Sequence, residues 1–207
     1  MAERAARTPD QRRDELVGRL FEAVLGMNDL YLIYIGDRLG FYRTLAEAGK
    51  VTPAELAAAT GTHERYVREW LEQQAVTGIL EVEGKEARRY GIPDGYEEVL
   101  TERDSLNYLA PFARMMVGMV RPLPAVMEAF RSGGGVPYAE YDADFCEGQA
   151  EMNRVQFINL LGSEWLPAVP GYRDIPQIDT ILTTPFCGLS LTDYLSTAAA
   201  VRRAAEC

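Results

Sequence analysis

The sequence has little cysteine and almost no histidine. Its three cysteines, Cys146, Cys187 and Cys207, are odd in number and far apart, and His63 is the only histidine. No CxxC pair or Cys/His cluster is present, so the ligand spacing typical of zinc sites is missing. We therefore expect no metal site, and the widely spaced cysteines indicate a reducing cytoplasm rather than a disulfide framework.

Long apolar runs are also missing. No stretch of the sequence approaches the roughly 20 apolar residues of a membrane-spanning helix, and residues 1–15 lack the apolar core of a signal peptide. The sequence therefore predicts a cytoplasmic protein with no membrane partner. An apolar fraction of 47% over 207 residues is sufficient for a buried core without metals or disulfides.

Basic side chains are outnumbered by acidic ones. The formal net charge is −10, and residues 51–100 contain ten carboxylates against five Lys and Arg side chains. Phosphate backbones attract clustered basic residues, so this balance argues against nucleic acid as a main partner.

The first part of the chain has the periodicity of helices followed by a hairpin. Apolar residues at three- and four-residue steps predict a long helix over 10–35, and a short helix is expected over 38–48. Thr52, Pro53 and Glu55 form the signature of a capping box, which opens a helix that Gly61 ends. Thr62 is predicted to cap a longer helix that ends near Gly78. Two short strands, 79–84 and 87–92, then complete a winged helix.

The pattern of the remaining residues predicts further helices and a tail. Residues 95–131 look helical with a break at 121–124, residues 132–142 form a glycine-rich loop, and a helix is expected over 145–161. The tail offers a short β-like run, 178–182, and an alanine-rich stretch. The predicted fold class is mainly α, a winged helix-turn-helix with a small β-hairpin wing and additional helices, without a complete Rossmann sheet. The predicted divisions are 1–94, 95–168 and 169–207.

Two segments carry a family resemblance. Residues 39–82, LGFYRTLAEAGKVTPAELAAATGTHERYVREWLEQQAVTGILEV, combine a Thr-Pro-x-Glu-Leu-Ala helix start with a Gly-Ile-Leu stretch, and Tyr90 follows in the wing strand. The chain resembles here the N-terminal winged-helix region of bacterial class I SAM-dependent methyltransferases. The resemblance continues through residues 133–170 and covers about four-fifths of the chain.

The resemblance also shows what is missing. In the family, a Rossmann-like domain follows, and the glycine-rich turn after its first strand approaches the cofactor SAM. After Pro170 the nearest candidate, residues 186–190, has one glycine. SAM is thus implied by family only, and we expect that this chain alone neither binds it nor catalyses methyl transfer. A truncated or frameshifted relative, half of a split enzyme and a stand-alone derivative all remain open.

The resemblance also implies a role for the glycine loop and the helix after it. In the family such a front domain caps the substrate pocket with aromatic and polar side chains, and Gln and Asn side chains both donate and accept hydrogen bonds. The alternative is that the aromatic and Met residues are core and the amides a solvated edge. The candidate substrate- or cofactor-facing residues are Tyr138, Tyr141, Phe145, Gln149, Met152, Asn153 and Phe157, and none is expected to be catalytic.

Two further features have plain interpretations. Gly133, Gly134 and Gly135 are not followed by the Lys-Ser/Thr of a phosphate-binding loop, so they predict a flexible hinge. His63 lies in the turn before a helix, where a capping or solvent-facing role is expected rather than a catalytic one.

Two functions from different classes remain. The first is a methyltransferase-family protein that retains the dimerisation and substrate-capping part, forms a homodimer through its N-terminal helices and depends on a separately encoded SAM-binding half. The second is a winged-helix transcriptional regulator or small-ligand sensor, although Glu64, Glu69 and Glu72 accompany Arg65 and Arg68 on the helix that would read DNA. A fragment that only dimerises is a third possibility.

Overall fold

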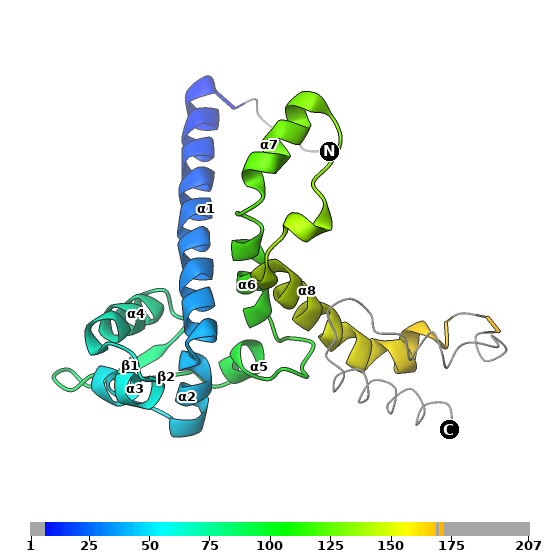
Figure 1. The fold of residues 1–207 in the computed structure, drawn as a ribbon. Helices are drawn as coiled ribbons and strands as arrows, with labels where there is room; N and C mark the ends of the chain where they lie inside the picture. The colour runs from blue at the N-terminus through cyan, green and yellow to red at the C-terminus, as the bar shows by residue number, and fades with distance from the viewer. Residues whose placement is uncertain (1–6, 169, 172–207) are drawn as a thin grey trace, which may run out of the picture.

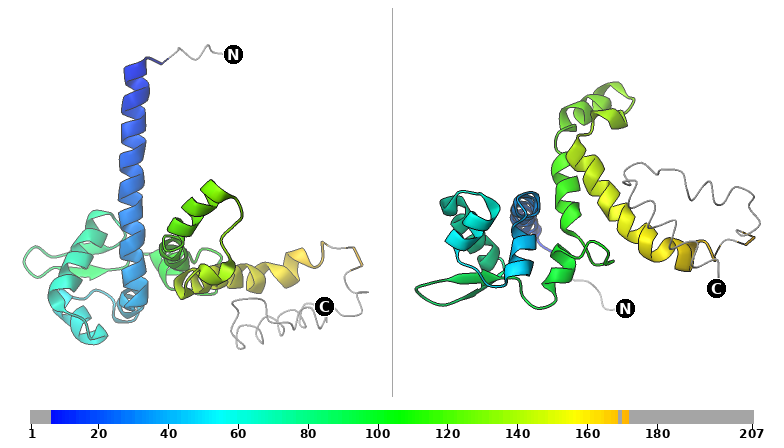
Figure 2. Two further views of the ribbon diagram at one scale, coloured as in Figure 1. Left: turned by 45° about the horizontal axis from the view of Figure 1, so that its top comes forward. Right: turned by 60° about the horizontal axis from the view of Figure 1, so that its bottom comes forward.

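The structure, a computed structural model that describes residues 7–168 and 170–171, begins with the long helix α1, Pro9–Arg38. Thr8 and Gln11 form a capping box: the Thr8 hydroxyl accepts from the Gln11 amide at 3.2 Å, and the Gln11 side chain accepts from the Thr8 amide at 2.9 Å. The predicted helix over 10–35 is therefore confirmed and extends three residues further. Every residue over 9–28 is exposed, and α1 projects well beyond the elements at its base (Figures 1 and 2).

A winged helix packs against the C-terminal end of α1 (Figure 1). Strands β1 and β2 pair antiparallel with Val82 opposite Tyr90, and Val51 adds an isolated bridge to Tyr90 on its other side. The predicted hairpin is confirmed, although each strand has only three residues. The elements are α2 (Phe41–Ala48), α3 (Pro53–Thr60), α4 (Glu64–Val76), β1 (Glu81–Glu83) and β2 (Arg89–Gly91).

The predicted capping box at the start of α3 is present. The Thr52 hydroxyl accepts from the Glu55 amide at 3.3 Å, and the Glu55 carboxylate accepts from the Thr52 amide at 2.7 Å. Gly61 ends α3 with a φ of +65°, the left-handed conformation that glycine adopts without steric cost. The prediction for the next helix was wrong by one residue, because His63 and not Thr62 is the N-cap. The His63 Nδ1 accepts from the Arg65 amide at 3.3 Å, which gives the only histidine of the chain a capping role.

Replacing Thr52 with alanine removes half of this capping box. We expect the free energy of unfolding to fall by about 1 kcal/mol, because the Glu55 amide loses its acceptor at the first turn of α3. Urea denaturation followed by circular dichroism measures the change. Thr44→Ala, which removes a half-buried hydroxyl that bonds back to the Gly40 carbonyl at 3.0 Å, is the control. An equal loss in both variants would contradict the capping argument.

The core of the winged helix is built around Trp70. Its indole Nε1 donates to the Leu32 carbonyl at 2.8 Å, and its ring meets Phe41 edge-on with centroids 4.9 Å apart. The buried Gln74 side chain accepts a hydrogen bond from the Tyr42 hydroxyl, which satisfies two polar groups inside an apolar core. Burial raises the pKa of Tyr42. The inner face of α4 consists of Val67, Trp70, Leu71 and Gln74, which are all buried.

The second half of the described chain is helical and lies on the other side of α1. The predicted break near 121–124 is confirmed, and a second break, the loop 101–109, was not predicted. Pro111 lies in the first turn of α6, where its missing N–H has no cost. The elements are α5 (Tyr96–Leu100), α6 (Ala110–Gly118), α7 (Leu123–Ser132), the 3-10 helix η1 (Tyr138–Glu140), α8 (Ala143–Gln156) and the π-helix η2 (Phe157–Trp165).

The helix predicted over 145–161 begins two residues earlier and continues to Trp165, but its last nine residues are a π-helix. A π segment of this length is rare, and nothing in the sequence indicated it. The predicted β-like run over 178–182 and the alanine-rich stretch after it lie outside the described residues.

Helices α6 and α8 cross in close contact because glycines lie at the crossing. A Cβ added at Gly148 would lie 2.6 Å from the Met115 nitrogen and 2.8 Å from the Pro111 carbonyl oxygen. These neighbours are backbone atoms, so α8 can approach α6 only with glycine at this position. Beside the crossing, Tyr108 is buried with Ala110 and Val155, and burial raises the pKa of Tyr108 to about 12.

The predicted fold class is confirmed. The described part of the chain is mainly helical, with a winged helix-turn-helix and further helices, and its sheet has only the two strands of the wing. No Rossmann sheet is present among these residues. The predicted divisions at 94/95 and 168/169 stay predictions.

Candidate functional site

Four of the seven predicted site residues lie together. The rings of Tyr141 and Phe145 are 4.4 Å apart at their centroids, and the Tyr138 ring lies 6.1 Å from each of them. The Tyr138 hydroxyl donates to the Gln149 side-chain oxygen at 3.2 Å. Asp142 fixes this group to the start of α8, since its side chain caps the helix by accepting from the Phe145 amide at 3.0 Å. We call Tyr138, Tyr141, Phe145 and Gln149 the aromatic cluster.

The other three predicted site residues lie further along the same helix. Met152 is half-buried and Asn153 is exposed, about one turn after Gln149. Phe157 lies at the first residue of η2, where its ring meets Trp165 edge-on at 5.7 Å. The shared helix face of Gln149, Met152 and Asn153 follows from their spacing, and their role toward a substrate stays a prediction.

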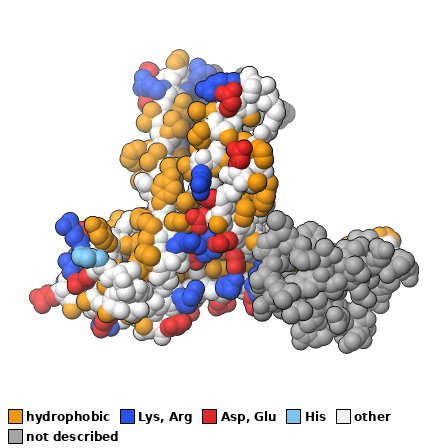
Figure 3. All heavy atoms as spheres, in the orientation of Figure 1, with side chains coloured by type: hydrophobic (Ala, Val, Ile, Leu, Met, Phe, Trp, Pro, Cys, Tyr) orange, Lys and Arg blue, Asp and Glu red, His pale blue; other side chains and the backbone are white. Residues whose placement is uncertain are grey.

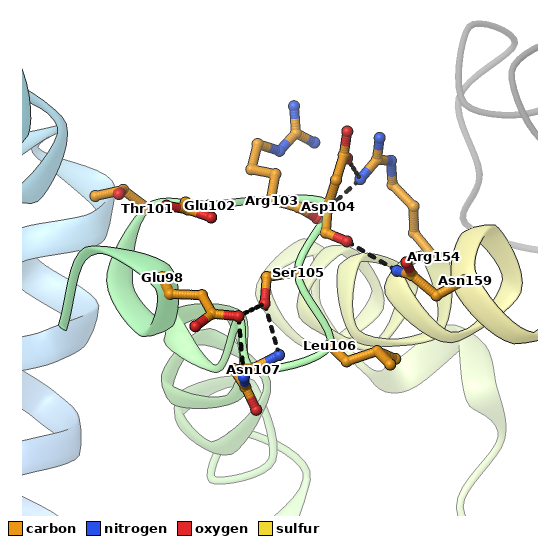
Figure 4. Close-up of a pocket in the computed structure, with 10 residues that line it drawn as sticks. All are labelled: Glu98, Thr101, Glu102, Arg103, Asp104, Ser105, Leu106, Asn107, Arg154 and Asn159. Carbon is orange, nitrogen blue, oxygen red and sulfur yellow. Dashed lines mark hydrogen bonds and ion pairs between the residues drawn. The ribbon is translucent and has the colours of Figure 1, made fainter. Parts of the chain in front are cut away.

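A large hollow in the described surface lies elsewhere, between the loop 101–109 and α8. It is open, has a volume of about 930 Å³ and contains none of the predicted site residues (Figure 4). Its polar groups already bond to one another. Arg154 lies 2.7 Å from Asp104 and donates to the Arg103 carbonyl at 3.0 Å, and Asn159 donates to the Asp104 carbonyl at 2.8 Å.

The carboxylate of Glu98 completes this hollow. It accepts hydrogen bonds from Ser105 and, at 2.9 Å, from Asn107, and these bonds lower the pKa of Glu98 (Figure 4). The partners are seven to fifty-five residues apart, so no local sequence signal could have marked the hollow. Because its groups serve to hold the loop against α8, we do not assign it a ligand.

A second, apolar hollow lies between α1 and α6. It has a volume of about 410 Å³. Its walls come from α1, α5 and the start of α6, and no charged side chain lines it. We call it the α1–α6 groove; its lining residues are Leu30, Ile33, Val99, Leu100, Leu109, Ala110, Phe112 and Ala113.

An ionic network joins α1 to α6 and α8 beside this groove. Arg114 and Asp37 form an ion pair at 2.7 Å, with only 18% and 13% of their side chains exposed. Tyr34 donates to Asp144 at 2.8 Å, and this hydrogen bond, followed by burial, raises the pKa of Tyr34. The network therefore fixes the angle at which the second half of the chain leaves the winged helix.

Three arginines on the surface that a winged helix would present to DNA lie in ion pairs. On α4, Arg68 pairs with Glu64 at 2.6 Å. In the wing, Arg88 pairs with Glu72 at 3.5 Å and Arg89 with Glu55 at 2.9 Å. Each of these cations would have to leave a carboxylate in order to bind a phosphate, and the carboxylates would remain to repel the backbone.

Neither a metal site nor a membrane-spanning helix is found among the described residues. Residues 7–168, 170 and 171 contain no group of three or more His, Cys, Asp and Glu side chains placed to hold a metal ion. None of the helices described is both long and apolar enough to cross a membrane.

Comparison with known proteins places the winged helix. Residues 29–102 match the family model of the Rv2258c-like winged HTH domain. The chain is also similar to the crystal structure of human N-acetylserotonin methyltransferase in complex with SAM. The TM-score is 0.51 and the sequence identity 18%, over 83% of this chain and 51% of that one. A comparison with curated proteins finds no match.

This likeness concerns the fold, and the chain spans about half the length of the methyltransferase it matches. The structural match covers 83% of this chain, which is a much longer stretch than residues 29–102. It therefore includes helices that follow the wing. The resemblance seen in the sequence and the observed fold thus agree. Residues 29–102 form a winged helix-turn-helix that matches the Rv2258c-like model, and the fold of the chain is similar to part of a methyltransferase structure.

Proposed function

We propose that this chain is the dimerisation and substrate-capping part of a SAM-dependent small-molecule methyltransferase, with methyl transfer performed by a SAM-binding domain outside the described residues. The observation that carries the proposal is the extent of the structural likeness. A winged helix alone is shared by many proteins, whereas here the likeness to a methyltransferase continues through the helices that follow it.

The described residues do not fit SAM by themselves. A SAM site of the Rossmann type needs a strand, a glycine-rich turn and a helix whose N-terminus faces the ligand. Here the two strands of the described chain belong to the wing, and the turn after β1 leads to β2 rather than to a helix. We therefore derive no methyl-transfer step within this chain and expect it to be inactive alone.

The capping role assigns a use to the aromatic cluster. Methyl transfer is an in-line displacement, so a front domain contributes by holding the acceptor in line and by excluding water. Tyr138 is 49% exposed and lies next to the loop of Gly133 and Gly134, both with positive φ. A cluster on such a loop can close over a substrate, with the Gln149 amide available to orient polar groups.

The winged helix then serves assembly rather than DNA recognition. The ion pairs on α4 and the wing disfavour phosphate binding, as described above. In contrast, α1 exposes large apolar side chains along the part that projects from the molecule (Figure 3). Such a surface is typical of a protein interface, and a second copy of the chain is the partner we propose.

Isothermal titration of the purified chain with SAM, with light scattering on the same sample, tests the proposal. We expect no binding heat and the mass of a dimer. Stoichiometric SAM binding would overturn the statement that the chain lacks a cofactor site. Titration with duplex DNA at two salt concentrations tests the regulator alternative: tight binding that weakens steeply with salt would replace our proposal with that one.

A further inference from the structure

The projecting part of α1 carries large apolar side chains that the rest of the described chain leaves exposed. Seven large side chains on it are each between 48% and 66% exposed. At about half exposure each, they present roughly 700 Å² of apolar surface, close to one partner's share of a standard interface. We call this surface the α1 strip; its residues are Leu16, Val17, Leu20, Phe21, Val24, Leu25 and Met27.

The strip and the α1–α6 groove form one continuous surface. Leu30, the first residue of the groove on α1, follows Met27 by three positions, about one helical turn. On the facing side, Leu109 and Phe112 of the groove are 51% and 42% exposed. Further exposed apolar residues continue along α6 and α7, including Phe130 at 90%.

We infer that the α1–α6 groove receives α1 of a second copy, with Leu16 and Leu20 of that copy inside it. This deepens the proposed function and rests on the dimer proposed there. In a two-fold symmetric pair, the α1 strip of each chain enters the α1–α6 groove of the other chain, so both grooves are filled. A helix laid into an apolar groove inserts residues four positions apart, which is the spacing of Leu16 and Leu20.

Charge determines which residues of α1 enter. Residues 10–15 contain Asp10, Arg12, Arg13, Asp14 and Glu15, some of which form exposed ion pairs within α1. An apolar groove would remove water from these charges and offer them no further polar partner. Leu16 is the first apolar residue after them. If the two α1 helices run antiparallel, the groove at Leu30 therefore meets the partner helix at Leu16, and the charged turns pass beyond the groove into water.

The lining also favours a helix over a small molecule. Ligand pockets usually combine apolar walls with a few polar groups that orient the ligand. The eight lining residues here are all apolar, and the groove is continuous with the strip rather than closed around a ligand. A second copy matches both features, because its α1 supplies the same kind of surface.

Two charge-introducing variants of the full chain test the inference, with molecular mass measured by light scattering over a dilution series. Leu20→Glu places a charge on the strip and Phe112→Glu places one on the groove. We expect each to raise the dimer dissociation constant roughly 100-fold or more, because the new carboxylate would be buried without a partner. Val82→Glu, at a wing position that is 46% exposed, is the matched control and should leave the mass unchanged. Circular dichroism verifies that every variant is folded.

Cross-linking gives a second measurement. The double variant Leu16→Cys/Leu109→Cys should form a disulfide-linked dimer under mild oxidation, faster than either single variant and faster than Leu16→Cys/Val82→Cys. Comparison with the single variants accounts for the natural cysteines.

The outcomes separate the inference from the proposal on which it rests. A dimer lost with Leu20→Glu but kept with Phe112→Glu would leave the dimer in place and overturn the role of the groove. A monomeric wild-type chain would overturn both. A dimer kept with both variants would show that dimerisation uses another surface. If a small apolar probe binds the groove without changing the molecular mass, the groove is a ligand site and not a site for the partner's helix.

Discussion

Replacing Gly148 with alanine is expected to lower the free energy of unfolding by about 2–3 kcal/mol, because a single methyl group forces α8 away from α6. The added Cβ would lie 2.6 Å from the Met115 nitrogen, 2.9 Å from the Met115 Cα and 2.8 Å from the Pro111 carbonyl oxygen. Side chains could rotate away from such a contact. These atoms belong to the backbone of α6, so the helices must separate, and the contacts of Ala110, Ala113 and Ala150 at the crossing are weakened.

The matched control is Gly135→Ala, in the glycine loop. A Cβ at Gly135 meets no atom within 4 Å, and its backbone φ lies outside the left-handed region. Chemical denaturation of both variants, followed by circular dichroism, should show a loss at position 148 and a change within about 0.5 kcal/mol at position 135. A Gly148→Ala variant as stable as the wild-type chain would mean that the α6–α8 crossing is looser than described.

Replacing Arg114 with methionine is expected to cost about 2–3 kcal/mol of unfolding free energy. Its ion pair with Asp37 is mostly shielded from water, and removal of one partner leaves the other charge half-buried and unpaired. The exposed pair Arg131–Glu128, with 67% and 63% of the two side chains in water, is the comparison. Arg131→Met should change stability by less than about 0.5 kcal/mol.

The double variant Arg114→Met/Asp37→Leu distinguishes burial of an unpaired charge from loss of attraction. With both charges absent, much of the stability lost in Arg114→Met should return, because apolar side chains fill a similar volume without a desolvation cost. If the double variant is less stable than the single one, the ion pair itself holds α1 to α6, and our account of its energy would be wrong.

The parts of the fold that follow from local chemistry could be predicted from the sequence. The capping box of Thr52 and Glu55 depends on residues three apart, and the termination at Gly61 depends on one residue. The inner face of α4 follows from its spacing. The shift of the next N-cap from Thr62 to His63 shows the limit of such signals, because neighbouring residues can both accept a hydrogen bond from the first turn.

The arrangement of the second half depends on contacts that local patterns do not contain. Arg114 and Asp37 are 77 residues apart, and Arg154 meets the carbonyl of Arg103 from 51 residues away. The π-helix η2 that follows α8 likewise has no local sequence pattern that would predict it. For the candidate site, the spacing placed Phe145 and Gln149 on one helix, but only the fold of the loop 133–142 brings Tyr138 and Tyr141 to them.

The position of Trp70 provides an internal optical reporter for the joint between α1 and the winged helix. The chain contains two tryptophans. The indole of Trp70 is 4% exposed and bonded to α1, whereas Trp165 is 39% exposed at the far end of η2. In a Trp165→Phe protein, all tryptophan emission would therefore originate at the α1–α4 contact. A red shift of that emission would register the detachment of α1, independently of what happens to the helices beyond the wing.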